Sequence, residues 1–271
     1  MPEQEGVNRR VWERGGHVEE YANRQLLPVE VLLLVRYREA VSGRSLELGC
    51  GAGRILGYLA ALGGEVRGID ISPAMVDHCR AAFPAADVKV GDLADLAESL
   101  GGDYNAILAM DNVLDVLDDA GRRRLLAQLR AMLGEDGLLV FSTHNLDYVD
   151  GPAHRAAPTD QTGGTVSRVL RGAAGRPLSD VPRLARRLPK RIRNRRQLGP
   201  LERREPGYAI LNDSAHDYSF LHYYIRAPDQ VRQLKEAGFE LVECLDVDGG
   251  HVAADRGAGD PWLHYVARPA R

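Results

Sequence analysis

Short apolar runs alternate with stretches of helical periodicity between residues 43 and 145. In the helical stretches, apolar side chains recur every three or four positions, as Ile55, Leu59 and Leu62 do. Strands joined by such helices form repeated βαβ units, in which helices cover both faces of a parallel sheet. We therefore predict an α/β fold. The predicted strands are residues 45–48, 65–69, 87–90, 104–110 and 137–143, and the predicted helices are residues 54–62, 73–83, 93–99 and 119–133.

The pattern changes after Asn145. Residues 147–212 are rich in Gly, Pro and Arg, and their one amphipathic stretch, 181–198, contains Pro189, which weakens a continuous helix. Apolar and polar residues then alternate from His216 to Ile225, which predicts a strand. Further elements are predicted as a helix at 228–237, strands at 239–246 and 262–267, and a helix in front of the sheet at 12–25.

These patterns divide the chain into four parts. Residues 1–43 are predicted to form an N-terminal helical cap, residues 44–146 the α/β core, residues 147–225 an insertion on the substrate side, and residues 226–271 the C-terminal part of the core. The insertion also differs in charge, because residues 151–207 hold 14 Lys and Arg against 4 Asp and Glu, whereas the whole chain has a formal net charge of −3. We expect this segment to form a substrate lid together with the cap.

Composition excludes several classes of protein. Hydrophobic residues make up 44% of the 271 residues and charged residues 27%, which is typical of a globular domain. The longest apolar run, 26–35, is too short to cross a bilayer, and residues 1–10 lack the apolar segment of a secretory signal. Cys50, Cys79 and Cys244 are an odd number without metal-like spacing, which favours a reducing compartment over disulfides. We therefore expect a cytoplasmic protein.

The strongest local signal is the run from Leu46 to Gly53, which reads L-E-L-G-C-G-A-G. A strand ends there in three glycines at alternate positions, and a helix begins at once. Glycine permits sharp backbone turns, and its missing side chain lets a ligand approach the amides at the helix N-terminus. A dinucleotide-binding loop would carry another Gly where this chain has Arg54. The loop therefore predicts a bound ligand, and a tight turn without one is the alternative.

Three acidic residues near the strand ends suit an adenosine-containing ligand. Glu47 can bind a cationic amino group or the loop itself, but it would repel a pyrophosphate. Asp70 can accept hydrogen bonds from both ribose hydroxyls, and Asp92 can accept one from an adenine amino group. The alternatives are a charge at the start of the next helix for Asp70 and a helix cap for Asp92. Further contacts to the adenine would come from Ile71, Met75 and the backbone of Leu93.

Four motifs in the same order resemble those of class I S-adenosylmethionine-dependent methyltransferases. They are E-L-G-C-G-A-G, G-I-D-I-S, G-D-L and G-E-D-G-L-L-V-F, and the resemblance covers residues 43–145 and 228–267. It implies a Rossmann-like, seven-stranded, mostly parallel sheet whose last strand, near 262–267, runs antiparallel. It also implies that S-adenosyl-L-methionine is the cofactor, lying over residues 49–53, and that S-adenosyl-L-homocysteine is the product.

A narrower resemblance concerns two short segments. Residues 104–112 and 143–145 are similar to glycine N-methyltransferase-like enzymes, which act on small molecules. Such families often close the cofactor site with an N-terminal segment, so Tyr21 and Arg24 resemble lid residues, with Arg24 available to the methionine carboxylate. A solvated helix face is the alternative for both. The predicted cofactor contacts are Tyr21, Arg24, Glu47, Gly49, Cys50, Gly51, Gly53, Asp70, Ile71, Met75, Gly91, Asp92, Leu93 and Met110.

The substrate is expected at the carboxyl ends of the strands, where ligands bind in open α/β sheets. His144 is the first candidate for a base that accepts a proton from a hydroxyl or ammonium nucleophile, and His222 is the second catalytic candidate. The alternative for His144 is a hydrogen-bonded histidine at a strand end. The predicted substrate contacts are Asp111, Asn112, Asn145, His216, Tyr218 and Tyr224.

Alternate side chains of the predicted strand 216–224 would share one face and form an aromatic and imidazole pocket wall. An ordinary edge strand is the alternative. His216 and His222 do not predict a metal site, because no third ligand stands at metal-like spacing.

The basic stretch 183–196 permits three roles. It can be a surface helix that docks through an apolar face, a contact to an anionic membrane surface or anionic substrate, or a contact to nucleic acid. Nucleic acid is disfavoured because no aromatic residues interleave the arginines to stack on bases. The apolar face consists of Val181, Leu184, Leu188 and Ile192.

The sequence as a whole predicts an S-adenosylmethionine-dependent methyltransferase that acts on an N or O atom of a small molecule. One alternative is an RNA-directed methyltransferase that uses the arginine cluster, and another is a non-catalytic subunit that binds S-adenosylmethionine. An NAD-dependent reductase is disfavoured by Arg54 and Glu47. The sequence predicts neither the identity of the substrate nor the oligomeric state.

Overall fold

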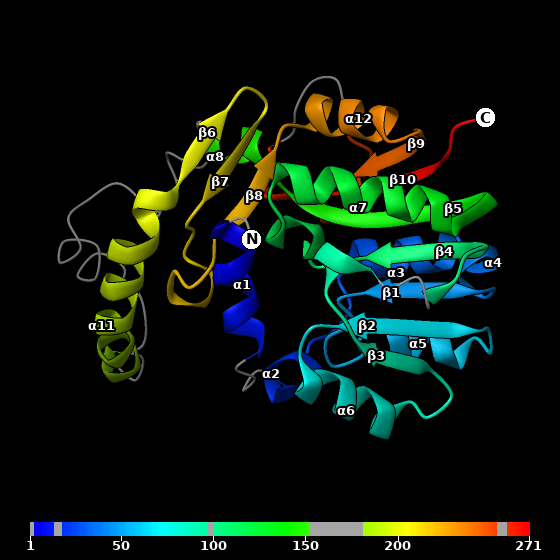
Figure 1. Ribbon diagram of the computed structural model, residues 1–271, viewed down its shortest axis with the longest axis horizontal. Coiled ribbons are helices and arrows are strands. Elements are labelled where there is room, and N and C mark those ends of the chain that lie inside the picture. Colours follow the sequence, from blue (N-terminus) through cyan, green and yellow to red (C-terminus); the bar gives the residue numbers. More distant parts are fainter. Residues whose placement is uncertain (1–2, 14–17, 97–99, 152–180, 254–258) are drawn as a thin grey trace.

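The computed structural model describes residues 3–13, 18–96, 100–151, 181–253 and 259–271. Within these residues, a sheet of ten strands forms the centre of the molecule, and helices lie on both of its faces (Figure 1). The strands are β1 (Ser45–Leu48), β2 (Val66–Asp70), β3 (Asp87–Val90), β4 (Tyr104–Ala109), β5 (Leu133–Asn145), β6 (Arg203–Glu205), β7 (Tyr208–Leu211), β8 (His222–Ile225), β9 (Phe239–Leu245) and β10 (Trp262–Pro269).

Seven of these strands follow the order β3-β2-β1-β4-β5-β10-β9. The first five pair in parallel, whereas β10 runs antiparallel to both β5 and β9. The carboxyl ends of the parallel strands therefore meet at one edge of the sheet. This arrangement confirms the predicted Rossmann-like α/β fold and its antiparallel last strand.

Three further strands correct the prediction of a seven-stranded sheet. Strand β8 pairs in parallel with His144 and Asn145, beyond Phe141, which is the last residue of β5 that pairs with β4. Strand β7 runs antiparallel to β8, and β6 runs antiparallel to β7. Part of the predicted insertion 147–225 thus continues the central sheet, because β5 extends past the end of β4 and offers unpaired backbone groups to another strand.

The helices cover two separate cores. Strand β4 contributes Ile107 and Ala109 to one core and Ala106 and Leu108 to the other. This alternation explains its nearly continuous apolar sequence, since a parallel strand is buried on both faces. The first core is covered by α7 (Asp119–Met132) and α12 (Ala227–Glu236), and the second by α3 (Pro28–Arg36), α5 (Leu56–Ala61) and α6 (Pro73–Ala82). The remaining helices are α1 (Glu3–Glu13), α2 (Val18–Ala22), α4 (Arg38–Val41), α8 (Leu146–Asp150) and α11 (Val181–Leu198).

The N-terminal region differs from the predicted cap. The predicted helix 12–25 is wrong, because α1 ends at Glu13 and α2 spans only Val18–Ala22. Helix α3 packs Val29 and Leu33 into the second core, so part of residues 1–43 belongs to the main body of the fold.

The predicted strand at 216–225 begins only at His222. His216, Asp217 and Tyr218 have positive φ angles of 47°, 62° and 60°, which turn the chain and prevent an extended conformation. The side-chain amide of Asn212 holds this turn by donating to the carbonyls of Tyr218 and Phe220, at 2.9 and 2.7 Å. The run therefore does not present one continuous face.

Helix α11 continues through Pro189, where the sequence indicated a weakened helix. Pro189 itself is exposed, so its ring does not have to be accommodated in a packed interface.

Candidate active site

A cavity of about 260 Å³ lies at the carboxyl edge of the sheet. The ends of β1, β2, β4 and β5 line it, and so do residues of α1 and α2, which lie beside that edge (Figure 1). The cavity brings together most of the predicted site residues: Tyr21, Arg24, Glu47, Gly49, Cys50, Gly51, Asp70, Ile71, Met75, Gly91, Asp92, Leu93, Met110, Asp111, Asn112, His144, His216 and His222.

The glycine loop offers bare backbone to this cavity. Gly49 and Gly51 have positive φ angles of 62° and 53°, which favour glycine. A Cβ atom at Gly49 would lie 2.4 Å from the Val113 side chain, whereas one at Gly51 would meet no atom within 4 Å. Packing therefore requires the first glycine, while the second leaves open space beside its backbone for a ligand.

Asp70 ends β2 and holds the loop in place. Its Oδ2 accepts a hydrogen bond from the Gly51 N–H at 2.9 Å, and its Oδ1 accepts one from the Ser72 N–H at 2.8 Å. Burial raises the pKa of this carboxyl group, and the two N–H donors oppose the rise. Each carboxylate oxygen has a second lone pair, so Asp70 can still accept two hydrogen bonds from a ligand.

Glu47 lies in β1 with one oxygen available. Its Oε2 is buried and has no hydrogen-bond partner among the described residues. Burial raises the pKa of this group well above its usual value, and a ligand ammonium group would compensate the buried oxygen. Nearby, Arg54 binds both carboxylate oxygens of the buried Glu30 in α3. The residue that replaces the third glycine of a dinucleotide loop thus ties the loop to α3.

Asp92 combines a capping role with an ion pair. Its Oδ1 accepts a hydrogen bond from the Ala94 N–H at 2.9 Å, which caps the 3-10 turn Leu93–Asp95, and its Oδ2 pairs with Arg9 of α1. The helix-cap alternative considered for Asp92 is therefore present. The carboxylate also lines the cavity, as does Arg9.

The predicted helical cap of residues 1–43 contains α1, but the sequence interpretation did not identify Glu3–Glu13 as a helix. Gln4 and Asn8 lie one helical turn apart and donate side-chain hydrogen bonds to backbone carbonyls of residues 115–117 and of Leu221, at 2.8–3.2 Å. These amides attach α1 to the molecule, together with the buried Val7 and the packing of Trp12 against Phe220. Two amides spaced by four residues were the available signal. The α1 residues that line the cavity are Glu5, Asn8, Arg9 and Trp12.

Aromatic rings from separate segments cover the cavity. The Trp12 ring lies 5.7 Å from those of Tyr21 and His216 and 5.2 Å from that of Phe220. Tyr21 Oη lies 3.2 Å from His216 Nε2. Arg24 lies over the Tyr21 ring and donates to Asp111 Oδ2 at 2.9 Å. The predicted lid residues therefore contact one another and also the end of β4.

The chain turns sharply after β4. Asp111 and Asn112 have positive φ angles of 57° and 59°, which are strained for residues other than glycine. The Asn112 N–H donates to Ser142 Oγ at 2.8 Å, and Asn112 Nδ2 lies 3.5 Å from His144 Nε2. Burial raises the pKa of Asp111, and Arg24 opposes that rise. The strained turn directs both side chains to the cavity that they line.

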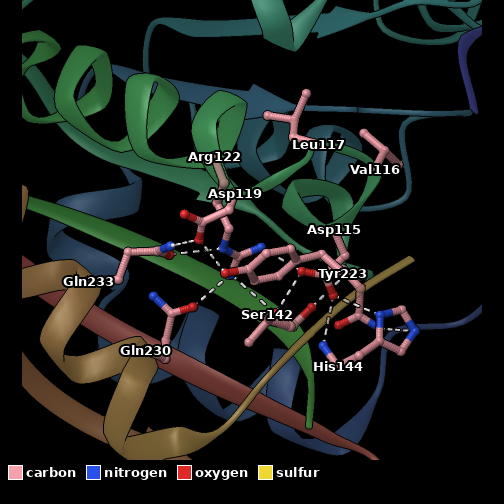
Figure 2. A network of polar contacts seen from close by, with 12 residues as sticks. Asp115, Val116, Leu117, Asp119, Arg122, Ser142, His144, Tyr223, Gln230 and Gln233 are labelled. Atoms are coloured by element: carbon pink, nitrogen blue, oxygen red, sulfur yellow. Dashed lines mark hydrogen bonds and ion pairs between the residues drawn. The ribbon is translucent and has the colours of Figure 1, made fainter. Parts of the chain in front are cut away.

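His144 is held by a buried carboxylate that the sequence interpretation did not identify. Asp115 Oδ2 lies 2.7 Å from both the backbone nitrogen and Nδ1 of His144. Figure 2 shows this contact as part of a larger polar network that includes Arg122 and two glutamines of α12. Because Nδ1 is bonded to Asp115, Nε2 is the ring nitrogen that remains for a ligand.

His222 lies beside His144 and has its own carboxylate. The two rings stack with centroids 5.0 Å apart. His222 Nδ1 lies 2.6 Å from Asp213 Oδ2, which also accepts a hydrogen bond from Tyr224 Oη at 2.8 Å. Burial acts to lower the pKa of His222, but Asp213 outweighs it and the net shift is upward. The two predicted catalytic histidines therefore occur as adjacent imidazoles, each bonded to a carboxylate.

His144, Asp213 and His222 form the one cluster in the described part of the chain that is close enough to hold a metal ion, with ligand atoms within 4.8 Å of one another. Asp213 already binds His222 and Tyr224, and Nδ1 of His144 is bonded to Asp115. The absence of a bound metal therefore stays a prediction.

Four predicted site residues do not line the cavity. A Cβ atom at Gly53 would lie 2.4 Å from Phe83. Asn145 caps α8 and donates to the Asp260 carbonyl at 2.9 Å, and Tyr224 lies behind His144 with its ring 4.7 Å away. Tyr218 lies beneath two guanidinium groups of α11, because the left-handed turn at 216–218 rotates it out of the predicted face. The predicted direct contacts from these residues are corrected accordingly.

The basic helix α11 supports this left-handed turn. Arg187 pairs with Asp217 at 2.9 Å, and Arg191 and Arg195 lie over the Tyr218 ring. Asn194 donates to the Asp217 carbonyl at 2.9 Å. The side chains of residues 181–186, including the predicted Arg183 and Arg186, lie outside the described residues. Part of the predicted charge at 183–196 is therefore used inside the protein.

The chain resembles known proteins in sequence. Residues 46–137 match a family described as "Methyltransferase domain". The ubiquinone biosynthesis O-methyltransferase of Xanthomonas axonopodis pv. citri is 31% identical over 124 residues, which are 44% of this chain and 51% of the relative. The enzyme of the same name from Xanthomonas campestris pv. campestris is 33% identical over 116 residues, or 41% and 47%. The chain spans about half the length of the curated relatives that it matches.

Solved structures are similar over almost the whole chain. The CcbJ methyltransferase from Streptomyces caelestis has a TM-score of 0.57 and 19% sequence identity, covering 97% of this chain and 96% of that chain. The glycopeptide N-methyltransferase MtfA, solved in complex with S-adenosyl-L-methionine, has a TM-score of 0.55 and 17% identity, covering 91% and 96%. At these identities the likeness concerns the fold.

Among the described residues, no helix combines the length and the apolar character that a membrane span requires.

Proposed function

We propose that this chain, whose residues 46–137 match a methyltransferase domain, is a class I S-adenosylmethionine-dependent methyltransferase that transfers the methyl group of S-adenosyl-L-methionine to an oxygen or nitrogen atom of a small molecule. S-Adenosyl-L-homocysteine would be the second product. The ubiquinone biosynthesis O-methyltransferases and the glycopeptide N-methyltransferase that the chain resembles support both acceptor atoms equally.

One observation carries the proposal: a single cavity contains groups suited to the cofactor and a base suited to the acceptor. We call Glu47, Gly51, Asp70 and Asp92 the cofactor end of the cavity. We call Asp111, Asn112, His144 and His222 its acceptor end. In a methyl transfer the sulfur, the methyl group and the acceptor atom must lie in line. The two ends therefore have to belong to one cavity.

The residues of the cofactor end fit S-adenosyl-L-methionine. Asp70 would hold the ribose hydroxyls with its remaining lone pairs, and the buried Oε2 of Glu47 would gain a partner in the ammonium group. The open space at Gly51 admits the ligand against the backbone. When bound, the cofactor supplies a methyl group on a positively charged sulfur.

The acceptor end would prepare the nucleophile. A hydroxyl or ammonium group must lose a proton before or during the transfer, and His144 Nε2 can accept it. Alignment of the acceptor atom with the sulfur and the methyl group contributes on the order of 7–11 kcal/mol in such reactions. Helices α1 and α2 would exclude water, which competes as a nucleophile.

The cover over the cavity supports a small substrate. Trp12, Tyr21 and His216 line the cavity and offer aromatic surface to a planar or cationic group. No described residue of α11 lines the cavity. This disfavours the alternative of an RNA substrate held by the arginine cluster.

The cofactor is tested by calorimetric titration with S-adenosyl-L-homocysteine. Asp70→Ala should lower the affinity about 10- to 100-fold, because hydrogen bonds to a charged group are lost. Asp77→Ala is the matched control, since it removes an exposed carboxylate from the neighbouring helix α6 and should leave the affinity unchanged. Equal affinities for the wild type and Asp70→Ala would overturn the role of Asp70.

The transfer itself is tested with a labelled methyl group. The wild type is incubated with labelled S-adenosyl-L-methionine and separate pools of phenols, amines and RNA, and mass spectrometry locates the label. A methylated small molecule supports the proposal. Label in RNA alone would favour the RNA-directed alternative, and cofactor binding without any transfer would favour the non-catalytic subunit.

A further inference from the structure

We propose that Asp115 and Arg122 are positioning residues, which fix the tautomer and orientation of His144 so that its Nε2 serves as the proton acceptor. The inference rests on the proposed function, in which His144 is the base. Neither residue lines the cavity, but Asp115 contacts His144, which does, and Arg122 contacts Asp115.

Asp115 holds His144 at two points. Its Oδ2 accepts hydrogen bonds from the backbone N–H of His144 and from Nδ1, both at 2.7 Å. Its Oδ1 accepts from Arg122 Nη1 at 2.5 Å and from Thr143 Oγ1 at 2.6 Å. The ring can therefore rotate only by breaking its bond to Asp115, and the carboxylate is fixed in turn from its other side.

Arg122 is fixed by α12. Its Nη2 donates to Gln230 at 2.7 Å and its Nε donates to Gln233 at 3.1 Å, as Figure 2 shows. The side chains of Arg122 and Asp115 are both 0% exposed. Burial acts to raise the pKa of Asp115, but Arg122 and His144 outweigh it and the net shift is downward. The carboxylate therefore stays charged behind the imidazole.

A purely structural role does not account for this arrangement. A buried ion pair adds little to stability compared with apolar residues of similar size. Here the carboxylate of the pair bonds the ring of a histidine that lines the cavity. A charged acceptor on Nδ1 keeps the proton on that nitrogen, so Nε2 is the acceptor; it faces Asn112 Nδ2 at 3.5 Å and would take a substrate proton in place of that contact.

The central test replaces Asp115 by Asn. The amide is close in shape, but its NH2 group can donate to Nδ1 and so favour a proton on Nε2. The matched control is Asp119→Asn, because Asp119 belongs to the same network through Tyr223 and Gln233 and has no bond to His144. Both variants are compared with the wild type and with His144→Ala.

Two measurements test whether Asp115 fixes the tautomer of His144. Nitrogen-15 NMR of the histidine rings, assigned by the resonance missing from His144→Ala, should show a protonated Nδ1 in the wild type and in Asp119→Asn, and a protonated Nε2 in Asp115→Asn. In the methyl-transfer assay, Asp115→Asn should lose about 100-fold or more in kcat, with KM and the affinity for S-adenosyl-L-homocysteine changed less than about threefold. An unchanged tautomer together with a near wild-type kcat would overturn the proposal.

A double variant separates positioning from general damage. In the His144→Ala background, Asp115→Asn should cost no further activity, because the residue it positions is already gone. Independent, multiplying losses would overturn the proposal. If the wild type transfers no methyl group but its tautomer still depends on Asp115, the proposed function fails while the positioning stands.

Thr143→Val covers the case in which Asp115→Asn does not fold. This change removes the hydrogen bond that Thr143 donates to Asp115 and the one it accepts from Arg122, and it keeps the Arg122–Asp115 pair. It should lower kcat about three- to tenfold and leave the cofactor affinity unchanged. A kcat equal to that of the wild type would count against the proposal.

Discussion

The cofactor end and the acceptor end of the cavity draw on different parts of the chain. Glu47, Gly51, Asp70 and Asp92 lie in or just after β1, β2 and β3, within 46 residues of sequence. His144 and His222 come from β5 and β8, and Asp111 and Asn112 come from the turn after β4. One end is assembled by local strand-to-helix turns, and the other by contacts between distant segments.

This difference determines which properties substitutions at each end can change. The turns of the cofactor end are fixed to the sheet, because Asp70 at the end of β2 accepts hydrogen bonds from the backbone N–H groups of Gly51 and Ser72. The acceptor end depends on side chains from the turn after β4, from the end of β5 and from the added strand β8. Substitutions there should alter the reaction and its substrate while leaving the cofactor bound.

The largest effect is expected for His144→Ala. Loss of the proton acceptor should lower kcat about 10²- to 10⁴-fold, while the affinity for S-adenosyl-L-homocysteine stays within about twofold. Steady-state kinetics and calorimetry measure the two quantities on the same preparation. His251→Ala is the control, because His251 has a side chain that is 70% exposed and lies outside the cavity. A parallel loss of cofactor affinity in His144→Ala would remove the distinction between the two ends.

A smaller effect is expected for Gly51→Ala. The new methyl group would occupy the open space that the cofactor needs, so the affinity for S-adenosyl-L-homocysteine should fall about tenfold or more. Gly63→Ala is a matched control, because Gly63 also has a positive φ, of 81°, and open space around its Cβ position, but lies outside the cavity. Both variants should lose about 1–2 kcal/mol of stability from backbone strain. Equal cofactor affinity in the two variants would contradict the assigned binding face.

The smallest effect is a pH dependence at the acceptor end. The folded-state pKa of His222 is raised above the value of about 6.5 expected in the unfolded chain, because Asp213, Asp115 and Asp111 outweigh the opposing effect of burial. Its interactions therefore stabilise the fold fully below about pH 6.5, and this contribution is lost as the pH rises through the folded pKa.

Urea unfolding of the wild type and His222→Gln, followed from pH 6 to pH 9, measures this contribution. The difference in unfolding free energy should shrink with rising pH, by up to about 1.4 kcal/mol per pH unit. A difference that grows with pH would mean that the charged imidazole is not the stabilised form.

The sequence predicted the cofactor end well because its signals are local. The residues 45–48 and 87–90 form the strands expected of them, and the predicted helix at 73–83 corresponds to α6. Period-two and helical patterns, glycines and acidic strand ends all lie within a few residues of the structure they specify. The cofactor contacts themselves stay predictions until a complex is measured.

The acceptor end was predicted only in part, for physical reasons that particular residues illustrate. Asp115 reads as one of several acids in the run D-V-L-D-D, and only the folded chain brings it against His144 and Arg122. The alternation around His216 indicated a strand, but side-chain hydrogen bonds from Asn212 stabilise a left-handed turn. Helix α1 has no apolar stripe to reveal it. Contacts between residues far apart in sequence leave no periodic signal.

The amides of α1 impose an order on the completion of the cavity. Gln4 and Asn8 bond to Leu221, which follows them by 217 and 213 residues. During synthesis the strands on either side of the glycine loop can pair early. Helix α1 has no complete docking surface until the segment before β8 has left the ribosome. A nascent chain would therefore form the cofactor end of the cavity long before α1 covers it. A cofactor bound by such an incomplete chain would not lead to methyl transfer.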